Sequence, residues 1–227
     1  MPMPVDFSTG IFFVDRRRAS FYAGLTIIRG DVMKALKAIA SLLAIGSAVF
    51  WVHAAAAVEL AGVKLDDSVR VGNQDLKLHG AGIRYKLVFK VYVIGLYLPE
   101  KKTAVVDVLA APGARRVSIT MLRDVGSDEF GKAFATGIEH NTDNAERLAL
   151  AIPMAKFKAM FATVPELRQG DVLHLDWMPG SGMVAALNGR RTFEPIADAA
   201  FYNAILRIWL GVRPVDDKLK RQLLGEQ

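Results

Sequence analysis

Alternating apolar and polar residues mark the strands that we expect in this chain. Residues 58–79 alternate locally and contain the Gly72–Asn73 pair, so they predict two short strands with a turn before the second. Residues 80–98 are mostly apolar and β-branched, and predict a further strand region that ends at Pro99. The same alternation predicts strands over 115–122, 171–178 and 183–189, the last two joined by a turn.

Four-residue spacing of apolar side chains marks the helices. Phe130, Phe134 and Ile138 predict a helix that begins with Ser127 as its N-cap. Residues 144–163 predict a second helix, which Pro153 should kink or break. Its expected buried side chains are Leu148, Ile152, Phe157, Met160 and Phe161. Further helices are expected over 102–110, over 196–210 and after Pro214.

The order of these elements predicts the class of fold. Strands come first, helices occupy the middle, and a hairpin and helices close the chain, without regular alternation of strand and helix. This order is typical of an α+β domain with a mostly antiparallel sheet. We expect this single domain to span residues 58–227.

The segment before residue 58 has a different pattern. Lys34 and Lys37 precede an uncharged run over 38–52, and the small residues 54–57 follow it. A basic segment, an apolar run and a small-residue cleavage site, in this order, are typical of a secretory signal peptide, which we assign to residues 33–57. The alternative is an uncleaved anchor, although the run reaches the ~20 residues of a spanning helix only with His53 and the alanines. The sequence therefore predicts a periplasmic or secreted protein without a membrane span after cleavage.

Residues 1–32 show no clear periodicity and do not fit in front of such a signal, so we interpret them as an extension from a mis-assigned start, with Met33 as the first residue. The whole chain has 29 Lys and Arg, 23 Asp and Glu, and no cysteine. Removing residues 1–57 removes six basic and three acidic side chains and leaves a net charge of only +3. Nucleic-acid binding then loses its main support, and the exported fold must depend on its hydrophobic core without disulfides.

The sequence contains none of the common motifs for catalysis or metal binding. It has no HExxH, no phosphate-binding loop, no Gly-rich dinucleotide motif and no G-x-S-x-G. His79, His140 and His174 have no partner at metal-ligand spacing, and His174 alternates with leucines as a surface histidine in a strand would. A tight turn explains Ser181 in PGSGM better than a nucleophile does. We therefore expect no metal and no cofactor.

Arg84 is the unusual residue of the strand region GAGIRYKLVFKVYVIGLYLP, residues 80–99. On an edge strand it would face water, beside Lys86 and Lys90 at the same parity. At the mouth of an apolar pocket, its guanidinium would offer a planar fork to a carboxylate or an enolate-like oxygen. Both interpretations fit the pattern.

Tyr92 would supply a second donor to the same ligand, and Gly80 and Gly82 would admit a ligand or a neighbouring backbone. A straight strand would hold Arg84 and Tyr92 ~26 Å apart. They can share a ligand only if the chain folds back between residues 85 and 91, where no Gly, Pro or Asn marks a turn.

GAGIR, followed by KVYVIGLYLPE, resembles the glycine–arginine strand and the following strand of the chalcone isomerase fold. RRVSITMLRDV, the helix after Gly126 and FYNAILRIWLGVRPVDDKLKRQLLG continue the resemblance, which covers nearly all of 58–227 in the same order. The chain is similar to the bacterial, exported branch of the chalcone isomerase-like proteins. This resemblance implies an open-faced β-sandwich, in which helices cover one face of a large antiparallel sheet and the ligand cleft lies between them.

Plant chalcone isomerases close a flavanone ring with polar side chains that this chain mostly lacks. Their strand arginine matches Arg84, and their threonine on the next strand matches Tyr92. Their helix tyrosine, helix asparagine and late-helix Ser or Thr fall near Phe130, Gly137 and Ile208. Unpaired polar ligand groups cost ~1–3 kcal/mol each, so the resemblance implies no useful chalcone isomerase activity.

The fatty-acid-binding relatives of that fold match this chain better. They keep an arginine and a tyrosine at the positions of Arg84 and Tyr92, where the pair holds a carboxylate. Phe130, Phe134, Ile208 and Trp209 would suit an acyl chain, or would simply pack in the core.

The resemblance thus favours a non-catalytic binding protein for a fatty acid or a similar amphiphilic carboxylate. One alternative is an isomerase or lyase acting on an enone or phenolic substrate, with Arg84 stabilising an anion. The other is an interaction module whose cleft is filled by Trp209 and Phe130. None of these interpretations fixes the oligomeric state.

Overall fold

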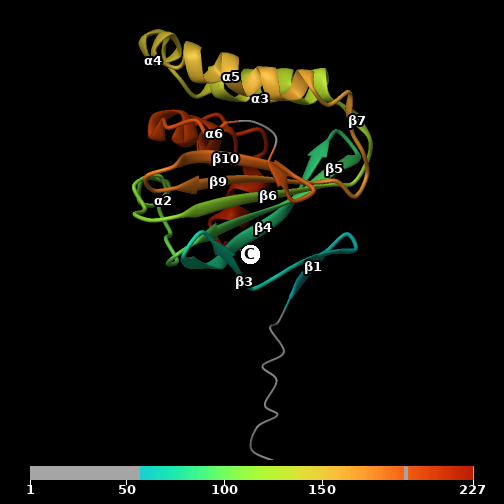
Figure 1. The fold of residues 1–227 in the computed structure, drawn as a ribbon. Coiled ribbons are helices and arrows are strands. Elements are labelled where there is room, and N and C mark those ends of the chain that lie inside the picture. Colours follow the sequence, from blue (N-terminus) through green and yellow to red (C-terminus); the bar gives the residue numbers. More distant parts are fainter. Residues whose placement is uncertain (1–56, 192–193, 227) are drawn as a thin grey trace, which may run out of the picture. The chain divides into compact units, whose positions relative to one another are not determined.

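The computed structural model describes residues 57–191 and 194–226 (Figure 1). Residues Ala55–Gln227 form one compact unit. The two hydrophobic core clusters found among the described residues lie within it, so this unit has a hydrophobic core of its own. The expected extension at 1–32 and the expected signal peptide, apart from residue 57, lie outside the described residues. In the part of the chain that the structure describes, no helix is long and apolar enough to cross a membrane.

A seven-stranded antiparallel sheet forms the centre of the described fold. Its strands lie in the order β11-β10-β9-β6-β5-β4-β3. They are β3 Ser68–Val71, β4 Gln74–Lys86, β5 Phe89–Leu98, β6 Arg115–Met121, β9 Val172–Met178, β10 Gly182–Leu187 and β11 Arg190–Arg191. Two small antiparallel pairs accompany it: β1 Val58–Leu60 with β2 Val63–Leu65, and β7 Val125–Gly126 with β8 Glu166–Leu167.

Helices cover one face of the sheet in two layers. They are α2 Val105–Leu109, α3 Ser127–His140, α4 Asn144–Ala149, α5 Ala151–Ala162, α6 Ala199–Leu210 and α7 Asp217–Leu223. Figure 1 shows α6 between the sheet and the outer pair α3 and α5. Because α6 is enclosed on both sides, it is buried almost all round, from Phe201 to Leu210. The α+β class and the open-faced β-sandwich expected from the sequence are confirmed.

Strand alternation builds the core between these layers. In β5, the even-numbered residues Tyr92, Ile94, Leu96 and Leu98 are buried in the main cluster, together with Phe157 and the other aromatic residues of the helices. The odd-numbered Tyr97 belongs instead to a small cluster on the other face of the sheet. Each buried aromatic or aliphatic side chain contributes ~1.5–3 kcal/mol of transfer free energy, so most of the stability comes from the main cluster.

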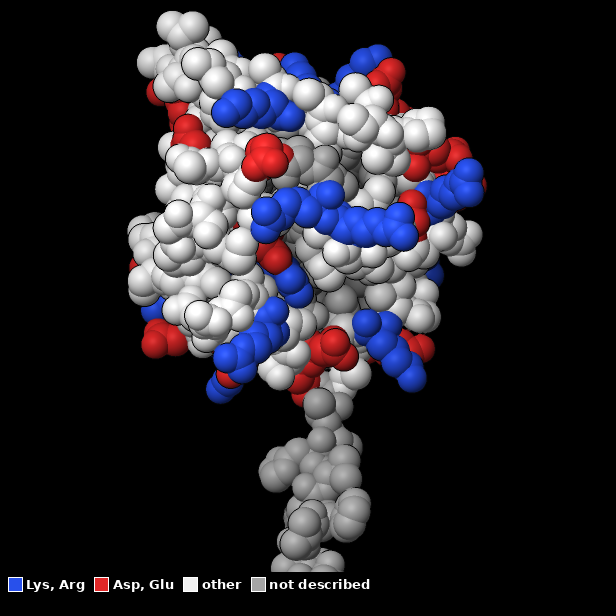
Figure 2. Space-filling view, viewed as in Figure 1, with Lys and Arg blue, Asp and Glu red and all other residues white. Residues whose placement is uncertain are grey.

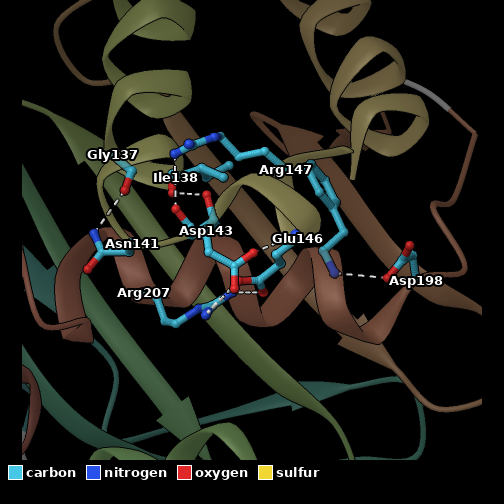
Figure 3. A network of polar contacts seen from close by, with 10 residues as sticks. Gly137, Ile138, Asn141, Asp143, Glu146, Arg147, Asp198 and Arg207 are labelled. Carbon is cyan, nitrogen blue, oxygen red and sulfur yellow. Dashed lines mark hydrogen bonds and ion pairs between the residues drawn. The ribbon is translucent and has the colours of Figure 1, made fainter. Parts of the chain in front are cut away.

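A polar network joins the outer helices to α6 (Figure 3). Arg207 of α6 donates to both carboxylate oxygens of Glu146 of α4. The buried Asn141, which follows α3, donates to Gly137 O and to Arg213 O, each at 2.9 Å. The network fixes the turn between α3 and α4 against the end of α6.

The structure corrects several expected helix details. The segment 144–163 breaks at Leu150, three residues before Pro153, which lies in the first turn of α5, where a missing N–H costs no bond. Phe157, Met160 and Phe161 are buried as expected, but Leu148 and Ile152 are 80% and 73% exposed. The N-cap of α3 is Gly126, and the Ser127 hydroxyl makes no hydrogen bond to the described residues.

Candidate ligand pocket

The region 80–98 is a hairpin, not one strand. β4 ends at Lys86 and β5 begins at Phe89, so Leu87 and Val88 form a two-residue turn. Arg84 and Tyr92 are direct partners across the two strands. Partner residues of an antiparallel pair have Cβ atoms about 5 Å apart, instead of the ~26 Å of a straight strand. The fold-back that a shared ligand requires is therefore present, at a turn without Gly, Pro or Asn.

A cavity of about 430 Å³ lies beside this pair. It is bounded by the β4–β5 hairpin, by residues 123–125 after β6, by α3, and by single residues of α6 and of the segment before α7. Arg84, Tyr92, Phe130, Phe134 and Ile208 line it, so five of the six expected site residues are brought together.

Trp209, the sixth expected residue, lies behind the wall of the pocket. Its Nε1–H donates to Tyr92 Oη at 2.9 Å, and its ring packs edge-on against Phe134 with centroids 5.5 Å apart. Trp209 is buried and does not line the cavity. It therefore holds Tyr92 from behind and contributes no surface to the cavity.

Tyr92 presents its hydroxyl as a donor. Burial raises its pKa to about 12, so the phenol stays protonated near neutral pH. Its oxygen already accepts the indole N–H of Trp209, and no described residue accepts the phenolic proton. That proton is available to an acceptor inside the cavity.

Arg84 has one ionic partner in the described chain, and the contact is loose. Its Nη1 lies 3.8 Å from Oδ2 of Asp216. The other oxygen of Asp216 accepts from Leu219 N at 3.0 Å and so caps α7. A single contact at this distance leaves the guanidinium fork of Arg84 open toward the cavity.

Gly80 and Gly82 serve helix packing and not ligand approach. A Cβ on Gly80 would collide with the backbone carbonyls of Gln222 and Leu223, and a Cβ on Gly82 with the side chains of Leu219 and Gln222. α7 therefore lies directly on β4 at these two positions. Of the two uses expected for the glycines, the structure supports close approach of a neighbouring backbone at Gly80, whereas Gly82 makes room for two side chains of α7.

The mouth of the pocket consists of residues that the sequence did not single out. Lys86 Nζ lies 2.9 Å from Glu129 Oε1, and this ammonium lowers the pKa of Glu129. The Arg123 guanidinium lies 5.2 Å from the centre of the Phe89 ring. All four side chains border the cavity. Hydrophobic periodicity cannot reveal them, because they become neighbours only through the hairpin and through the packing of α3.

Two of the positions that match polar residues of the chalcone isomerases line the pocket with apolar side chains. Phe130 and Ile208 both line the pocket, and neither brings a hydroxyl group to it. Gly137 lies where α3 meets α6, since a Cβ there would be 2.9 Å from Ile208 Cγ2. The position near the expected asparagine therefore contributes to helix packing and not to the pocket lining.

The described histidines do not line the cavity. His79 Nδ1 lies 2.8 Å from Leu223 O and holds the end of α7 to β4. His174 faces away from the main core and is half-buried; burial first, and then the nearby Arg116 cation, lower its pKa. Within residues 57–191 and 194–226, no group of His, Asp and Glu could hold a metal ion.

The fold and the pocket define a class of protein, an α+β sandwich with an apolar cleft that carries one arginine–tyrosine pair. Residues 57–225 match the family described as chalcone isomerase-like, and this chain belongs to that family. No curated protein matches the sequence. Among solved structures, the chain is similar to a fatty-acid binding protein of Arabidopsis thaliana, with a TM-score of 0.58 and 14% sequence identity. The match covers 74% of this chain and 95% of the plant protein, and it shows a shared fold.

Proposed function

We propose that this protein binds a fatty acid or a similar amphiphilic carboxylate without catalysis. The observation that carries the proposal is the register of the β4–β5 hairpin, which pairs Arg84 with Tyr92 at the wall of an apolar cavity. Arg84 supplies a charged fork and Tyr92 supplies one phenolic donor. A carboxylate has two oxygens and can accept from both.

The apolar lining fits the rest of such a ligand. Phe130, Phe134 and Ile208 offer only carbon surface to the cavity, and its volume of about 430 Å³ lies within the range of small-molecule sites. Each methylene of an acyl chain that leaves water contributes ~0.8 kcal/mol. The fold shared with a fatty-acid binding protein supports the same proposal.

The two alternatives, an enzyme and an interaction module with a filled cleft, explain fewer features of the pocket. The plant chalcone isomerases place polar groups at the positions that match Phe130 and Ile208, and both side chains are apolar in this chain. A filled cleft requires Trp209 and Phe130 to occupy the cavity, whereas Trp209 lies behind its wall and Phe130 lines it. The Arg84–Asp216 contact is the one feature that a filled, non-binding cleft would also show.

Arg84→Ala tests the proposal. We expect the wild-type chain to bind hexadecanoate with a rise in melting temperature, and the variant to lose about tenfold or more in affinity, because the carboxylate loses a charge-assisted bond. Isothermal titration and native mass spectrometry measure the two effects. Arg70→Ala, on β3 and 67% exposed in its side chain, is the matched control and should bind like the wild type. Turnover of chalcones or unsaturated acids that Arg84→Ala abolishes would instead establish the enzyme.

We also propose that the protein acts outside the cytoplasm, on the basis of the signal-like pattern over residues 33–57. Fractionation followed by N-terminal sequencing tests this location. The expected result is a periplasmic or secreted chain that begins directly after one of the residues 54–57. A cytoplasmic chain that retains residues 33–57 would contradict it.

A further inference from the structure

The tip of the β4–β5 hairpin is apolar and exposed, next to the mouth of the pocket. Leu87, Val88 and Phe89 are 90%, 81% and 56% exposed, and they are consecutive in the sequence. Leu87 and Phe89 also border the cavity, whose deeper wall is formed by the buried Tyr92 and Phe130. The apolar tip and the apolar cavity are therefore continuous.

The folding of the hairpin does not explain the residue at the tip. Leu87 has φ = 57°, in the left-handed region where a branched side chain is strained. The first position of such a two-residue turn favours Gly, and Asn also tolerates it, both of which suit water better than Leu. An apolar side chain that is strained and almost fully exposed stabilises neither the turn nor the core. Its presence points to contact with something outside the chain.

Basic side chains accompany the tip. Lys86, Lys90 and Arg123 lie beside it, on the hairpin and on the segment after β6. Of the two carboxylates at the mouth, Glu129 is paired with Lys86, and Asp124 accepts from Gln169 N at 2.7 Å. Lys90 has no ionic partner among the described residues. On the face shown in Figure 2, Lys and Arg side chains form a band across the middle, and Asp and Glu side chains occur around it.

We propose that the hairpin tip docks the pocket mouth on an anionic lipid surface. Leu87, Val88 and Phe89 enter the boundary between headgroups and acyl chains, and Lys90 and Arg123 meet the phosphates. A narrow, protruding tip of consecutive apolar residues suits a bilayer better than a flat protein interface does. The inference rests on the proposed function in one respect. If the pocket binds a lipid, docking lets that lipid enter the pocket directly from the membrane.

Vesicle binding of a Val88→Asp variant tests the proposal, because Val88 is exposed and does not line the cavity. The chain that begins at Ala55 is used, so that the apolar run over 38–52 cannot bind the vesicles. Vesicles contain phosphatidylglycerol and phosphatidylcholine in equal parts, or phosphatidylcholine alone. We expect the unsubstituted chain to sediment with the anionic vesicles more than with the neutral ones, and Val88→Asp to lose about tenfold in binding.

Ile152→Asp is the matched control, since Ile152 is a β-branched residue of similar exposure on α5, 73% against 81% for Val88. It should bind vesicles like the unsubstituted chain, and circular dichroism should show both variants folded. An equal loss in the two variants, or no binding of the unsubstituted chain, overturns the proposal. So does a dimer in sedimentation velocity that Val88→Asp dissolves, because the tip then contacts a second copy.

Titration with hexadecanoate in the absence of vesicles separates this inference from the proposed function. If the chain binds hexadecanoate but not vesicles, the docking surface is wrong and the pocket stands. If it binds vesicles through Val88 but not hexadecanoate, the pocket assignment is wrong and the docking surface stands.

Discussion

Arg84 differs from the other partly buried arginines of the described chain in how few of its donors are used. Arg115 donates to Leu109 O and Asn203 Oδ1, each at 3.0 Å, and lies over the Tyr202 ring. Arg116 forms two bonds with Asp176, at 2.7 and 2.6 Å. Arg84 has only the contact with Asp216 at 3.8 Å, although its side chain is just 23% exposed. A sheltered cation with unused donors costs free energy, which a bound carboxylate would offset.

At the scale of elements, the position of α7 depends on two glycines of β4. Gly80→Ala would place its Cβ against the carbonyls of Gln222 and Leu223, which cannot move unless the helix moves. Gly82→Ala would meet the flexible ends of Leu219 and Gln222. We expect Gly80→Ala to lower the free energy of unfolding by ~2–3 kcal/mol and Gly82→Ala by ~1 kcal/mol or less, measured by urea denaturation. Equal effects would mean that α7 is not held in this way.

Most elements could be predicted from the sequence, because their periodicity agrees with their burial. The turn at Gly72–Asn73, the strand over 115–122 and the helix ending at Gly211 follow from local chemistry alone. The hairpin turn at Leu87–Val88 could not be predicted, since a leucine with positive φ carries no turn signal. Leu148 and Ile152 were expected to be buried, but α4 and α5 form the outer layer and turn these two side chains toward water.

The sequence pattern alone left Arg84 open between an edge-strand residue and a pocket residue, and the family resemblance favoured the pocket. On a straight strand, Arg84 and Tyr92 would face the same side but lie far apart. Their pairing therefore depends on the fold-back of the β4–β5 hairpin. Trp209 was expected to line the cleft together with Ile208. A helix turns about 100° per residue, so neighbouring residues face different sides, and Trp209 packs behind Tyr92 instead.

For the molecule as a whole, the buried tyrosines predict a loss of stability in alkali. Burial raises the pKa of Tyr92 from 10.0 to about 12, raises the pKa of Tyr97 to about 12, and raises the pKa of Tyr202 further. The folded chain thus keeps phenolic protons that the unfolded chain releases. For Tyr92, the contribution of the protonated phenol to the free energy of unfolding is fully present below the unfolded-state pKa of 10.0. It is lost as the pH rises through the folded-state pKa of about 12.

The free energy of unfolding should therefore fall between about pH 10 and about pH 12, by up to ~1.4 kcal/mol per pH unit for each fully buried phenol. Tyr92→Phe keeps the ring and removes the ionisable group. The free energy of unfolding of this variant should therefore fall less steeply with rising pH than that of the wild type. Tyr85→Phe, at a position 37% exposed, is the matched control and should leave the slope unchanged. Urea denaturation at several pH values measures the slopes. Equal slopes for Tyr92→Phe and the wild type would mean that Tyr92 ionises without unfolding, and that the phenol beside Arg84 is open to solvent.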